Sequence, residues 1–306
     1  MPIIEPYDPT RDEAAIFDLW QRALGAQWPM TPEQLRRVIE APGTHNAHLV
    51  ARDGAQLIGL AATQHGERDN LVALLVDPDW RQRGIGTALH DAALDRLHGA
   101  GARRVQLGGG ETRFWPGVPA NLPAARSFFE ARGWTFSGQS IDLTHDLRGY
   151  ETPATLRLSQ AVFRVATPAD MDKLLEFEQR EFPYWRGAYQ VVAQFGDIDD
   201  FLLACVPHNG AIIGALIIYT PHSHPSRTDV IWKTLLGDDA GGLGCVGVAQ
   251  AARKYGAGTA LVARGSEIAK ERGVGNCFIG WTGLREFYGR LGYREWQSYA
   301  MSTREL

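Results

Sequence analysis

The sequence predicts an α/β protein made of two tandem domains of similar design. At 306 residues the chain is about twice the usual length of one globular domain, and 44% of its residues are hydrophobic, which suffices for two cores. The same order of features occurs twice along the chain. In each copy strand-like and helix-like segments alternate, which is the pattern of an α/β fold.

The first copy contains a predicted hairpin, a buried strand and a helix. Residues 47–51 and 57–63 have the pattern of two strands joined at Asp53-Gly54, a pair that favours a tight turn. The apolar run 71–76 predicts a buried strand. After Gly86, apolar residues recur every three or four positions, as they do on the buried face of a helix.

The second copy repeats this order. It opens with a strand at 162–165, and Thr167 then offers a helix N-cap, followed by proline and by an acidic residue in the first turn. A hairpin is predicted at 201–206 and 211–220, turned at Asn209-Gly210. The apolar run 243–248 predicts the strand that corresponds to 71–76.

The predicted boundary between the copies lies near residues 150 to 160, after Arg148-Gly149-Tyr150 and before the new first strand. We therefore expect an N-terminal domain at 1–150 and a C-terminal domain at 160–306. Two domains of this size lie within the usual range for an independent core.

A glycine-rich element follows the buried strand in both copies. It reads Arg81-Gln82-Arg83-Gly84-Ile85-Gly86-Thr87 in the first copy and Arg253-Lys254-Tyr255-Gly256-Ala257-Gly258-Thr259 in the second. A strand that enters a helix through such a turn presents unpaired backbone N–H groups and the positive end of a helix dipole. The element therefore predicts an anion site in each copy. It lacks the Gly-Lys-Ser/Thr of a P-loop and the third glycine of a dinucleotide fingerprint.

A pair of aromatic phrases follows later in each copy. They read Phe128-Phe129-Glu130-Ala131-Arg132-Gly133-Trp134 and Phe287-Tyr288-Gly289-Arg290-Leu291-Gly292-Tyr293. The first copy has a longer stretch before its phrase, and the proline-punctuated segment 115–123 is the expected place of the extra residues.

With the repeated Arg-x-x-Gly-x-Gly and the later aromatic phrase, the chain resembles the GNAT superfamily of N-acetyltransferases over nearly its whole length. The resemblance implies two tandem domains, each with a mixed, mostly antiparallel sheet flanked by helices, and acetyl-CoA as cofactor. Loop amides would hold the pyrophosphate, and the pantetheine arm would lie along the preceding strand. The implied cofactor contacts are Val246, Val248, Arg253, Lys254, Tyr255, Gly256, Ala257, Gly258 and Thr259, with Val76, Arg81, Arg83, Gly84, Ile85, Gly86 and Thr87 in the first copy.

The resemblance also implies that Tyr288 is the general acid that protonates the departing thiolate. The matching residue of the first copy is Phe129, which has no proton to donate. We therefore expect a catalytic C-terminal domain and a non-catalytic N-terminal domain. Strand 243–248 contains no carboxylate, so no general base is assigned, and four acidic residues remain as candidates, namely Glu181, Asp238, Asp239 and Glu286.

The expected acceptor is the primary amine of a small molecule, which attacks directly in a ternary complex. The aromatic residues Trp185 and Trp281 suit a sugar ring, although core packing explains them equally well. The arrangement resembles tandem glucosamine and glucosaminide N-acetyltransferases. Acetylation of an amino acid, a peptide or a mycothiol-type thiol precursor remains open, as does a catalytically silent protein that binds or senses acyl-CoA.

The remaining composition excludes several other classes. A net charge of −4 without basic clusters argues against nucleic acid as a partner, and the longest apolar run, 211–219, is too short to cross a membrane. Three widely spaced cysteines and the lack of an export signal predict a cytoplasmic protein. Two histidines in 221–225 without a third ligand do not predict a metal site.

Overall fold

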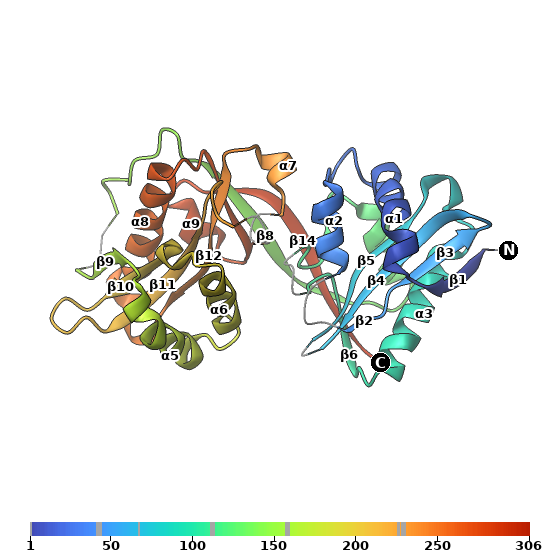
Figure 1. Cartoon of the computed structure of the whole chain (residues 1–306), viewed down its shortest axis with the longest axis horizontal. Helices are drawn as coiled ribbons and strands as arrows, with labels where there is room; N and C mark the ends of the chain where they lie inside the picture. The colour runs from blue at the N-terminus through green and yellow to red at the C-terminus, as the bar shows by residue number, and fades with distance from the viewer. Residues whose placement is uncertain are drawn as a thin grey trace. The chain divides into compact units, whose positions relative to one another are not determined.

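The computed structural model of the protein describes residues 2–40, 45–66, 68–110, 114–156, 160–224, 227 and 231–306. Within this part the chain forms two compact units. One consists of the residues up to Ser140 together with Gln297–Leu306, and the other is Ile141–Trp296. Each unit has a mixed, mostly antiparallel sheet flanked by helices, which confirms the predicted fold class (Figure 1).

The sheet of the first unit has the strand order β1-β3-β4-β5-β6-β14. The parallel pair is β5 with β6, and the other described pairings in this sheet are antiparallel. Its strands are β1 (Ile3–Pro6), β2 (His45–Asn46), β3 (Leu49–Asp53), β4 (Gln56–His65), β5 (Asp69–Val76), β6 (Arg104–Leu107), β7 (Val118–Pro119) and the end of β14 (Arg294–Glu305). Its helices are α1 (Pro9–Ala23), α2 (Pro32–Ile39), α3 (Ile85–Gly99) and α4 (Pro123–Glu130).

The sheet of the second unit has the order β8-β13-β12-β11-β10-β9 and again contains one described parallel pair, β12 with β13. Its strands are β8 (Phe136–Asp146), β9 (Val162–Val165), β10 (Phe201–Cys205), β11 (Ile212–Tyr219), β12 (Ala240–Val248) and β13 (Asn276–Thr282). Its helices are α5 (Met171–Glu181), α6 (Arg186–Gln194), α7 (Lys233–Leu236), α8 (Ala257–Glu271) and α9 (Arg285–Gly289).

Helices cover both faces of the second sheet. Leu203, Ala215 and Ile217 pack in one core cluster with residues of α5 and α6, whereas Leu202 and Leu216 belong to a second cluster with residues of α8. Successive side chains of a strand point to opposite faces, so this alternation places α5 and α6 on one face and α8 on the other. α9 contributes to the α8 cluster through Tyr288.

The helix starts follow the capping signals of the sequence. Thr167 is the N-cap that the sequence predicts, and it forms a capping box with Asp170 before α5; Asp170 also pairs with Arg164 of β9 at 2.6 Å. Before α2, Thr31 forms a capping box with Gln34. These side chains accept hydrogen bonds from N–H groups that have no partner within the first turn of a helix.

The units differ from the predicted domains 1–150 and 160–306 at two places. Residues 141–146 of β8 belong to the second unit, where they pair with β13, and the last ten residues belong to the first unit, where Thr303–Glu305 of β14 pair with β6. Each half of the chain thus supplies the final strand of the other unit. The sequence shows the order of the strands but not their partners, so its repeat suggested a simple boundary between the copies.

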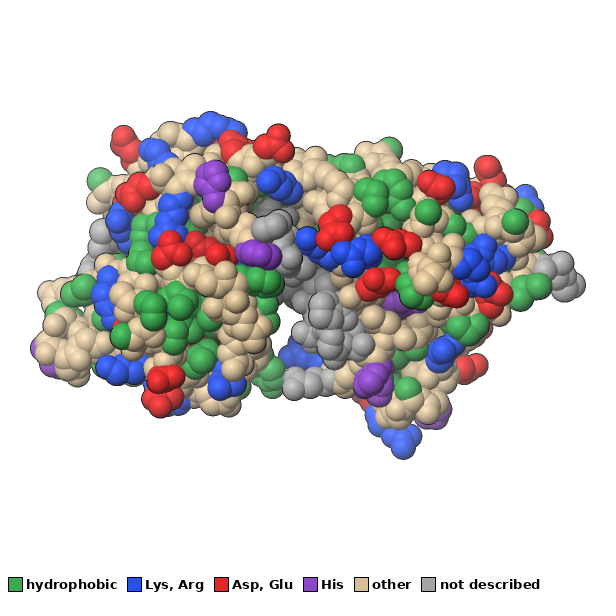
Figure 2. Space-filling model, viewed as in Figure 1, with side chains coloured by type: hydrophobic (Ala, Val, Ile, Leu, Met, Phe, Trp, Pro, Cys, Tyr) green, Lys and Arg blue, Asp and Glu red, His purple; other side chains and the backbone are tan. Residues whose placement is uncertain are grey.

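Acidic and basic side chains alternate over α1 and α2, so their charges largely cancel on this face (Figure 2). Arg36 pairs with Glu33 at 2.7 Å, and Arg37 pairs with the same carboxylate at 2.9 Å. Exposed pairs of this kind contribute little to stability, because water and salt screen their charges. Among the described residues, every helix is too short or too polar to span a lipid bilayer.

Because residues 297–306 of β14 belong to the first unit, we expect a substitution there to lower the stability of the first unit. Tyr299 is fully buried in β14, and Tyr299→Ala is expected to destabilise that unit by about 3–5 kcal/mol, because the ring leaves a cavity. Hydrogen exchange of peptides from 2–140 and from 141–296 measures the two units separately. Glu305→Ala, an exposed position of the same strand, is the control. Loss of protection confined to 141–296 would contradict the assignment of residues 297–306 to the first unit.

Candidate active site

The glycine-rich turn of the second unit, residues 253–259, leaves backbone N–H groups uncovered at the start of α8. We call this segment, and its first-unit counterpart 81–87, a cradle. After β12 a 3-10 turn (Gln250–Tyr255) leads to Gly256, which has a φ of 73° and caps α8 without a side-chain hydrogen bond. Arg253 Nε donates to Val248 O at 3.0 Å and closes the turn. The N–H groups of the first helical turn therefore have no capping side chain, which is the arrangement that binds anions.

The first unit contains the same cradle at the start of α3. Arg81 Nε donates to Val76 O at 3.1 Å, and Gly84, with a φ of 82°, caps the helix without a side-chain bond. A Cβ at Gly86 would lie 3.3 Å from the Phe128 ring, and one at Gly258 would lie 3.5 Å from the Phe287 ring. The two copies of the glycine element thus have the same local structure.

The remaining predicted contact residues lie around these cradles. Tyr255 is exposed, while Ile85 and Ala257 are buried first residues of their helices. Thr87 Oγ1 accepts a hydrogen bond from Arg132. The Arg83 guanidinium lies 4.8 Å from the Trp80 ring centre.

The backbone of Lys254 belongs to the 3-10 turn, and its side chain lies outside the described residues. Val246, Val248, Gly256, Gly258 and Thr259 lie at the end of β12 and the start of α8.

Pairing between β12 and β13 stops well before either strand ends. The two strands pair from Ala240 with Asn276 to Gly242 with Phe278, and β12 then continues to Val248. Three residues beyond the last pair, each strand has a non-glycine residue in left-handed backbone conformation: Cys245 at φ 48° and Trp281 at φ 57°. Such conformations cost about 1–3 kcal/mol and cluster at functional sites.

Both left-handed residues are held by buried groups. Trp281 N–H donates to Asp142 Oδ1 at 2.9 Å, and Asp142 is fully buried. Cys245 O accepts a hydrogen bond from Tyr189 Oη, at 3.0 Å, on α6. Each contact fixes one peptide unit. The backbone of β12 and of β13 is therefore held in place just beyond the point where their pairing stops, which we call the strand junction.

The glycines of β12 let aromatic rings lie directly on the strand. A Cβ at Gly244 would lie 2.7 Å from the Tyr219 ring, and one at Gly247 would lie 2.5 Å from the Phe182 ring. Trp185 stacks on Phe182 with ring centres 4.8 Å apart and planes 22° apart. The structure therefore places the predicted residue Trp185 next to β12, while Trp281 lies on β13 and is partly exposed.

Tyr288 lies on α9, on the same face of the sheet as α8. It is 5% exposed, its ring centre is 4.8 Å from that of Phe287, and burial raises the pKa of its hydroxyl to about 12. Within the described part of the chain this hydroxyl makes no hydrogen bond. Its first-unit counterpart, Phe129, is 7% exposed and packs against Trp134.

A buried carboxyl that the sequence analysis missed lies on the face of the sheet that α5 and α6 cover. Glu178 of α5 is fully buried, and neither of its carboxyl oxygens has a hydrogen-bond partner among the described residues. Burial raises its pKa to about 8, and the neighbouring Tyr189 hydroxyl opposes part of this shift. The signal was present in the sequence: Leu174, Phe177 and Glu178 lie on one face of the helix, so an acidic residue occupies a core position.

The four carboxylates considered as a general base lie in more ordinary surroundings. Glu181 accepts a hydrogen bond from Arg180 at 3.1 Å, and Asp239 pairs with Arg148. Asp238 and Glu286 are exposed. None of the four shares the deep burial of Glu178.

The first unit has packed aromatic rings in the stretch that follows β6. Pairing of β5 with β6 ends at Leu71, and the stretch between β6 and β7 then brings Phe114 and Trp115 into the core, with ring centres 4.2 Å apart. Trp115 lies 5.7 Å from Trp20 of α1 and 5.3 Å from Trp28. Aromatic rings therefore pack next to α1 in the region where the sequence predicts extra residues.

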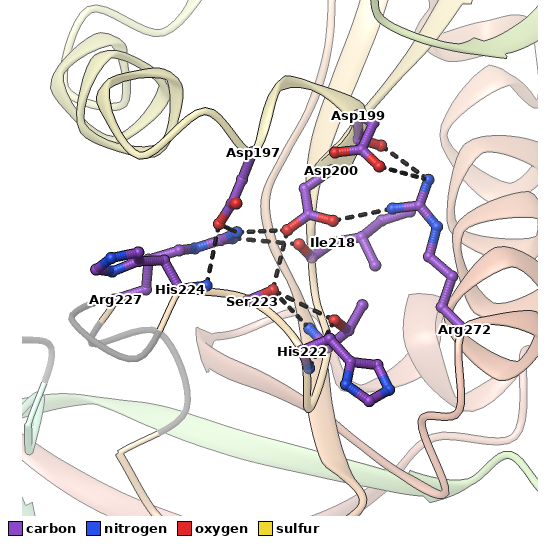
Figure 3. A network of polar contacts seen from close by, with 10 residues as sticks. Asp197, Asp199, Asp200, Ile218, His222, Ser223, His224, Arg227 and Arg272 are labelled. Carbon is purple, nitrogen blue, oxygen red and sulfur yellow. Dashed lines mark hydrogen bonds and ion pairs between the residues drawn. The ribbon is translucent and has the colours of Figure 1, made fainter.

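A polar pocket of the second unit lies at the opposite end of α8 from the cradle (Figure 3). Asp200 binds Arg227 and Arg272, and Ser223 Oγ donates to the same carboxylate at 3.0 Å. Arg227 is almost fully buried. The charged side chains of this pocket are largely paired with one another. Their contacts connect the segments next to β10, β11 and the end of α8.

The histidine pair that the sequence analysis weighed as metal ligands borders this network. The His224 ring stacks on Phe195 at 4.4 Å, and Pro225 of the same segment lies outside the described residues. No group of three potential metal ligands gathers elsewhere in the described part of the chain.

The buried Glu178 carboxyl predicts a pH-dependent stability. Its pKa is raised in the folded protein, from an ordinary value of 4.5 to about 8, so the unfolded chain releases this proton first. The ionisation of this side chain therefore costs no stability below about pH 4.5 and progressively destabilises the fold up to about pH 8. Glu178→Gln is expected to be more stable than the original protein at pH 7.5, by up to several kcal/mol, with a smaller difference at pH 5. Urea unfolding at both pH values measures this, and a difference independent of pH would contradict the assignment.

Comparisons with known proteins agree with the duplicated architecture. The model of the acetyltransferase (GNAT) family matches residues 13–134 and 171–293, one match in each unit. A mycothiol acetyltransferase of Rhodococcus opacus is 32% identical over 139 residues, which are 45% of this chain and 41% of that protein.

Solved structures of similar proteins include the glucosamine N-acetyltransferase region of a fungal multi-domain GH3 β-N-acetylglucosaminidase. It has a TM-score of 0.93 and 34% identity over 99% of this chain and 38% of that protein. A GCN5-related N-acetyltransferase of Sphaerobacter thermophilus has a TM-score of 0.74 at 20% identity, over 99% and 95% of the two chains, and so shares the fold. The matches span less than half of the length of the R. opacus and fungal proteins. With both units matched by the family model, the chain belongs to the acetyltransferase (GNAT) family.

Proposed function

We propose that the second unit transfers an acetyl group from acetyl-CoA to the primary amine of a small molecule. The observation that carries this proposal is the junction of β12 and β13, where pairing stops beside a bare helix start and a buried tyrosine. The left-handed Cys245 and Trp281 give both strands a fixed, irregular backbone at this place. Acyl transfer needs such preordered donors next to the reacting carbonyl.

The residues of the cradle fit a diphosphate. The α8 start offers backbone N–H groups from Gly256, Ala257 and Gly258, and a Cβ at Gly258 would lie in ordinary contact with Phe287 and Val248. Val246 and Val248 would contact the pantetheine arm, and Arg253, Lys254, Tyr255 and Thr259 would flank the phosphates. When bound, acetyl-CoA supplies the thioester that is attacked. Val76, Arg81, Arg83, Gly84, Ile85, Gly86 and Thr87 form the equivalent proposed set of the first unit.

We assign the general-acid role to Tyr288. Burial raises the pKa of its hydroxyl to about 12, so this side chain carries its proton at neutral pH and can donate it to a departing thiolate. The first unit has Phe129 here, and Phe114 and Trp115 pack with Trp20 and Trp28 in the stretch that follows its β6. We therefore propose that the first unit is non-catalytic, and that binding of acyl-CoA without turnover is a second candidate function for it alone.

An amino sugar is the acceptor that we favour. The stacked Phe182 and Trp185 rings beside β12, with Trp281 on β13, offer flat apolar surfaces of the kind that pack against sugar rings. The glucosamine N-acetyltransferase region that this chain resembles over 99% of its length supports that class. Because the chain is also similar to a mycothiol acetyltransferase, the amine of a thiol precursor is a second possible acceptor. Amino acids and peptides remain alternatives.

Two measurements test the proposed function. Acetyl-CoA at 100 times its dissociation constant is expected to stabilise the protein by about 2.7 kcal/mol. Thiol release from acetyl-CoA is then followed with amino sugars, cysteinyl amines, amino acids and peptides in turn. Stabilisation without thiol release for every amine would favour the silent binding protein, and the absence of both would contradict the proposal.

The cradle assignment predicts a loss of cofactor binding on Gly256→Val. A side chain at this left-handed position obstructs the phosphates and strains the turn, so calorimetry should detect no acetyl-CoA binding in the second unit. Gly84→Val makes the matched change in the first unit and is expected to leave second-unit affinity and thiol release intact. Unaltered affinity in Gly256→Val would place the phosphates elsewhere.

The acid assignment predicts that Tyr288→Phe lowers kcat by about 10²- to 10⁴-fold, with little change in acetyl-CoA affinity. Removing the hydroxyl keeps the ring that packs on Phe287. The reciprocal Phe129→Tyr is expected to create no second active site, because the aromatic rings that follow β6 in the first unit stay in place. Full kcat in Tyr288→Phe at neutral pH would contradict the acid role.

A further inference from the structure

The strand β13 has a bulge at Trp281, opposite Asp142 of β8. Between its last two pairs with β8, β13 advances by three residues and β8 by two; these pairs are Ile279 with Leu143 and Thr282 with Ile141. The extra residue of a bulge is left out of the ladder, so its buried N–H needs another acceptor. Trp281 N–H donates to Asp142 Oδ1 at 2.9 Å, and Asp142 is fully buried. The Asp142 carboxylate thus holds the bulge in place.

The bulge changes the face of the sheet on which Trp281 lies. Ile279, two positions earlier, belongs to the core cluster on the α8 side, and regular alternation would place Trp281 there too. Both neighbours of Asp142 in β8 belong to that cluster, so Asp142 lies on the other face, which α5 and α6 cover. Because the bulge sets Gly280 and Trp281 against Asp142, both take its face. A Cβ at Gly280 would lie 3.3 Å from Asp142 Oδ1, in agreement with this assignment.

The neighbouring strand β12 has a bulge with the same effect. Between two of its pairs with β11, β12 advances by three residues and β11 by two; these pairs are Gly244 with Ile217 and Gly247 with Ala215. Leu243 belongs to the α8 cluster, but the left-handed Cys245 belongs to the cluster of α5 and α6. Regular alternation would place these two residues on one face. In β12, too, the bulge moves a left-handed residue to the α5 and α6 face.

Phe182 and Trp185 lie on this face as well. The Phe182 ring occupies the space that a side chain at Gly247 would need, and the valines on both sides of Gly247 belong to the α8 cluster. Trp185 stacks on the Phe182 ring, with ring centres 4.8 Å apart. Both bulges come after the last pair of β12 with β13. Trp281 therefore borders the strand junction from the β13 side, and the stacked rings border it from the β12 side.

Resting on the function proposed above, we propose that Asp142 is a positioning residue of the acceptor site. By accepting the Trp281 N–H, it fixes the bulge that turns the Trp281 indole to the face of Phe182 and Trp185, where these rings pack against the apolar faces of an amino sugar. Asp142 is fully buried and acts through Trp281. Since Asp142 lies before the predicted boundary at residue 150, both sequence copies contribute to this site.

Binding of glucosamine to the full chain, saturated with CoA, tests this role without turnover. The chain is labelled with ¹⁵N-tryptophan, and Trp281→Phe identifies the Trp281 resonances. Glucosamine is expected to shift the Trp281 indole resonance. In Asp142→Ala the Trp281 amide resonance is expected to move, because its acceptor is lost, and the Kd of glucosamine to rise about tenfold, the effect of one misplaced aromatic contact. Asp142→Asn keeps an oxygen acceptor and is expected to hold the Kd within about twofold of the original value.

A double-mutant cycle shows whether Asp142 acts through Trp281. Trp281→Ala is expected to raise the Kd and the KM of glucosamine about tenfold, with an unchanged KM of acetyl-CoA. Asp142→Ala is expected to add nothing in that background, whereas a merely structural carboxylate would add its own effect. The matched control is Asp170→Ala, which removes a buried carboxylate that accepts the Thr167 N–H next to the edge strand β9. It is expected to lower stability and to leave the KM of glucosamine unchanged.

Additive effects of Asp142→Ala and Trp281→Ala, or an unchanged Kd of glucosamine in Trp281→Ala, would overturn the proposal. If Asp142→Ala does not fold, Asp142→Asn and Trp281→Ala decide. The neutral oxygen of Asn is a weaker acceptor, so a Trp281 amide resonance that stays in place in Asp142→Asn would also overturn the proposal. A shifted Trp281 indole resonance without thiol release for any amine would contradict the proposed function alone. Thiol release with an indole resonance that glucosamine does not shift would contradict the positioning role alone.

Discussion

The early end of pairing between β12 and β13 is the constraint on which the second unit depends. Parallel strands that pair along their whole length satisfy every backbone group on their shared edge, whereas here β12 continues without β13 after Gly242. The free edge coincides with two left-handed residues and with the helix start at Gly256. Irregular backbone of this kind persists only where its surroundings hold it. Asp142 and Tyr189 provide that support from buried positions.

The two units show how one architecture diverges after duplication. Both retain the arginine that closes the glycine turn onto the last strand residue, at 3.1 Å in the first unit and 3.0 Å in the second. They differ at the strand junction, where the first unit has stacked Phe114 and Trp115 and the second has a glycine-rich strand. The first unit therefore retains the turn that we propose binds phosphate, while aromatic rings follow its β6 and glycines occur along β12 of the second unit.

Much of the fold was predictable from the sequence, because hydrophobic periodicity and turn residues are local signals. The hairpins, both glycine turns and the N-cap at Thr167 occur as predicted. The pairing of β8 with the second unit and of β14 with the first was not predictable, since pairing between strands distant in the sequence leaves no local pattern. The left-handed Cys245 and Trp281 are also unexpected, because neither residue type favours that conformation and only tertiary contacts impose it. Glu178 was overlooked among acidic residues that are mostly exposed, and only its position on the apolar face of α5 distinguishes it.

The exchanged strands also affect how this chain matures on the ribosome. The first sheet has an open edge at β6 until residues 297–306 have emerged, and those residues follow the whole second unit in the chain. An unpaired strand edge invites association with other chains, so the nascent N-terminal half has to be kept from aggregating throughout translation. Completion of the first unit therefore waits until the ribosome has passed the whole second unit, and a chain that stops before residue 297 leaves the β6 edge without β14.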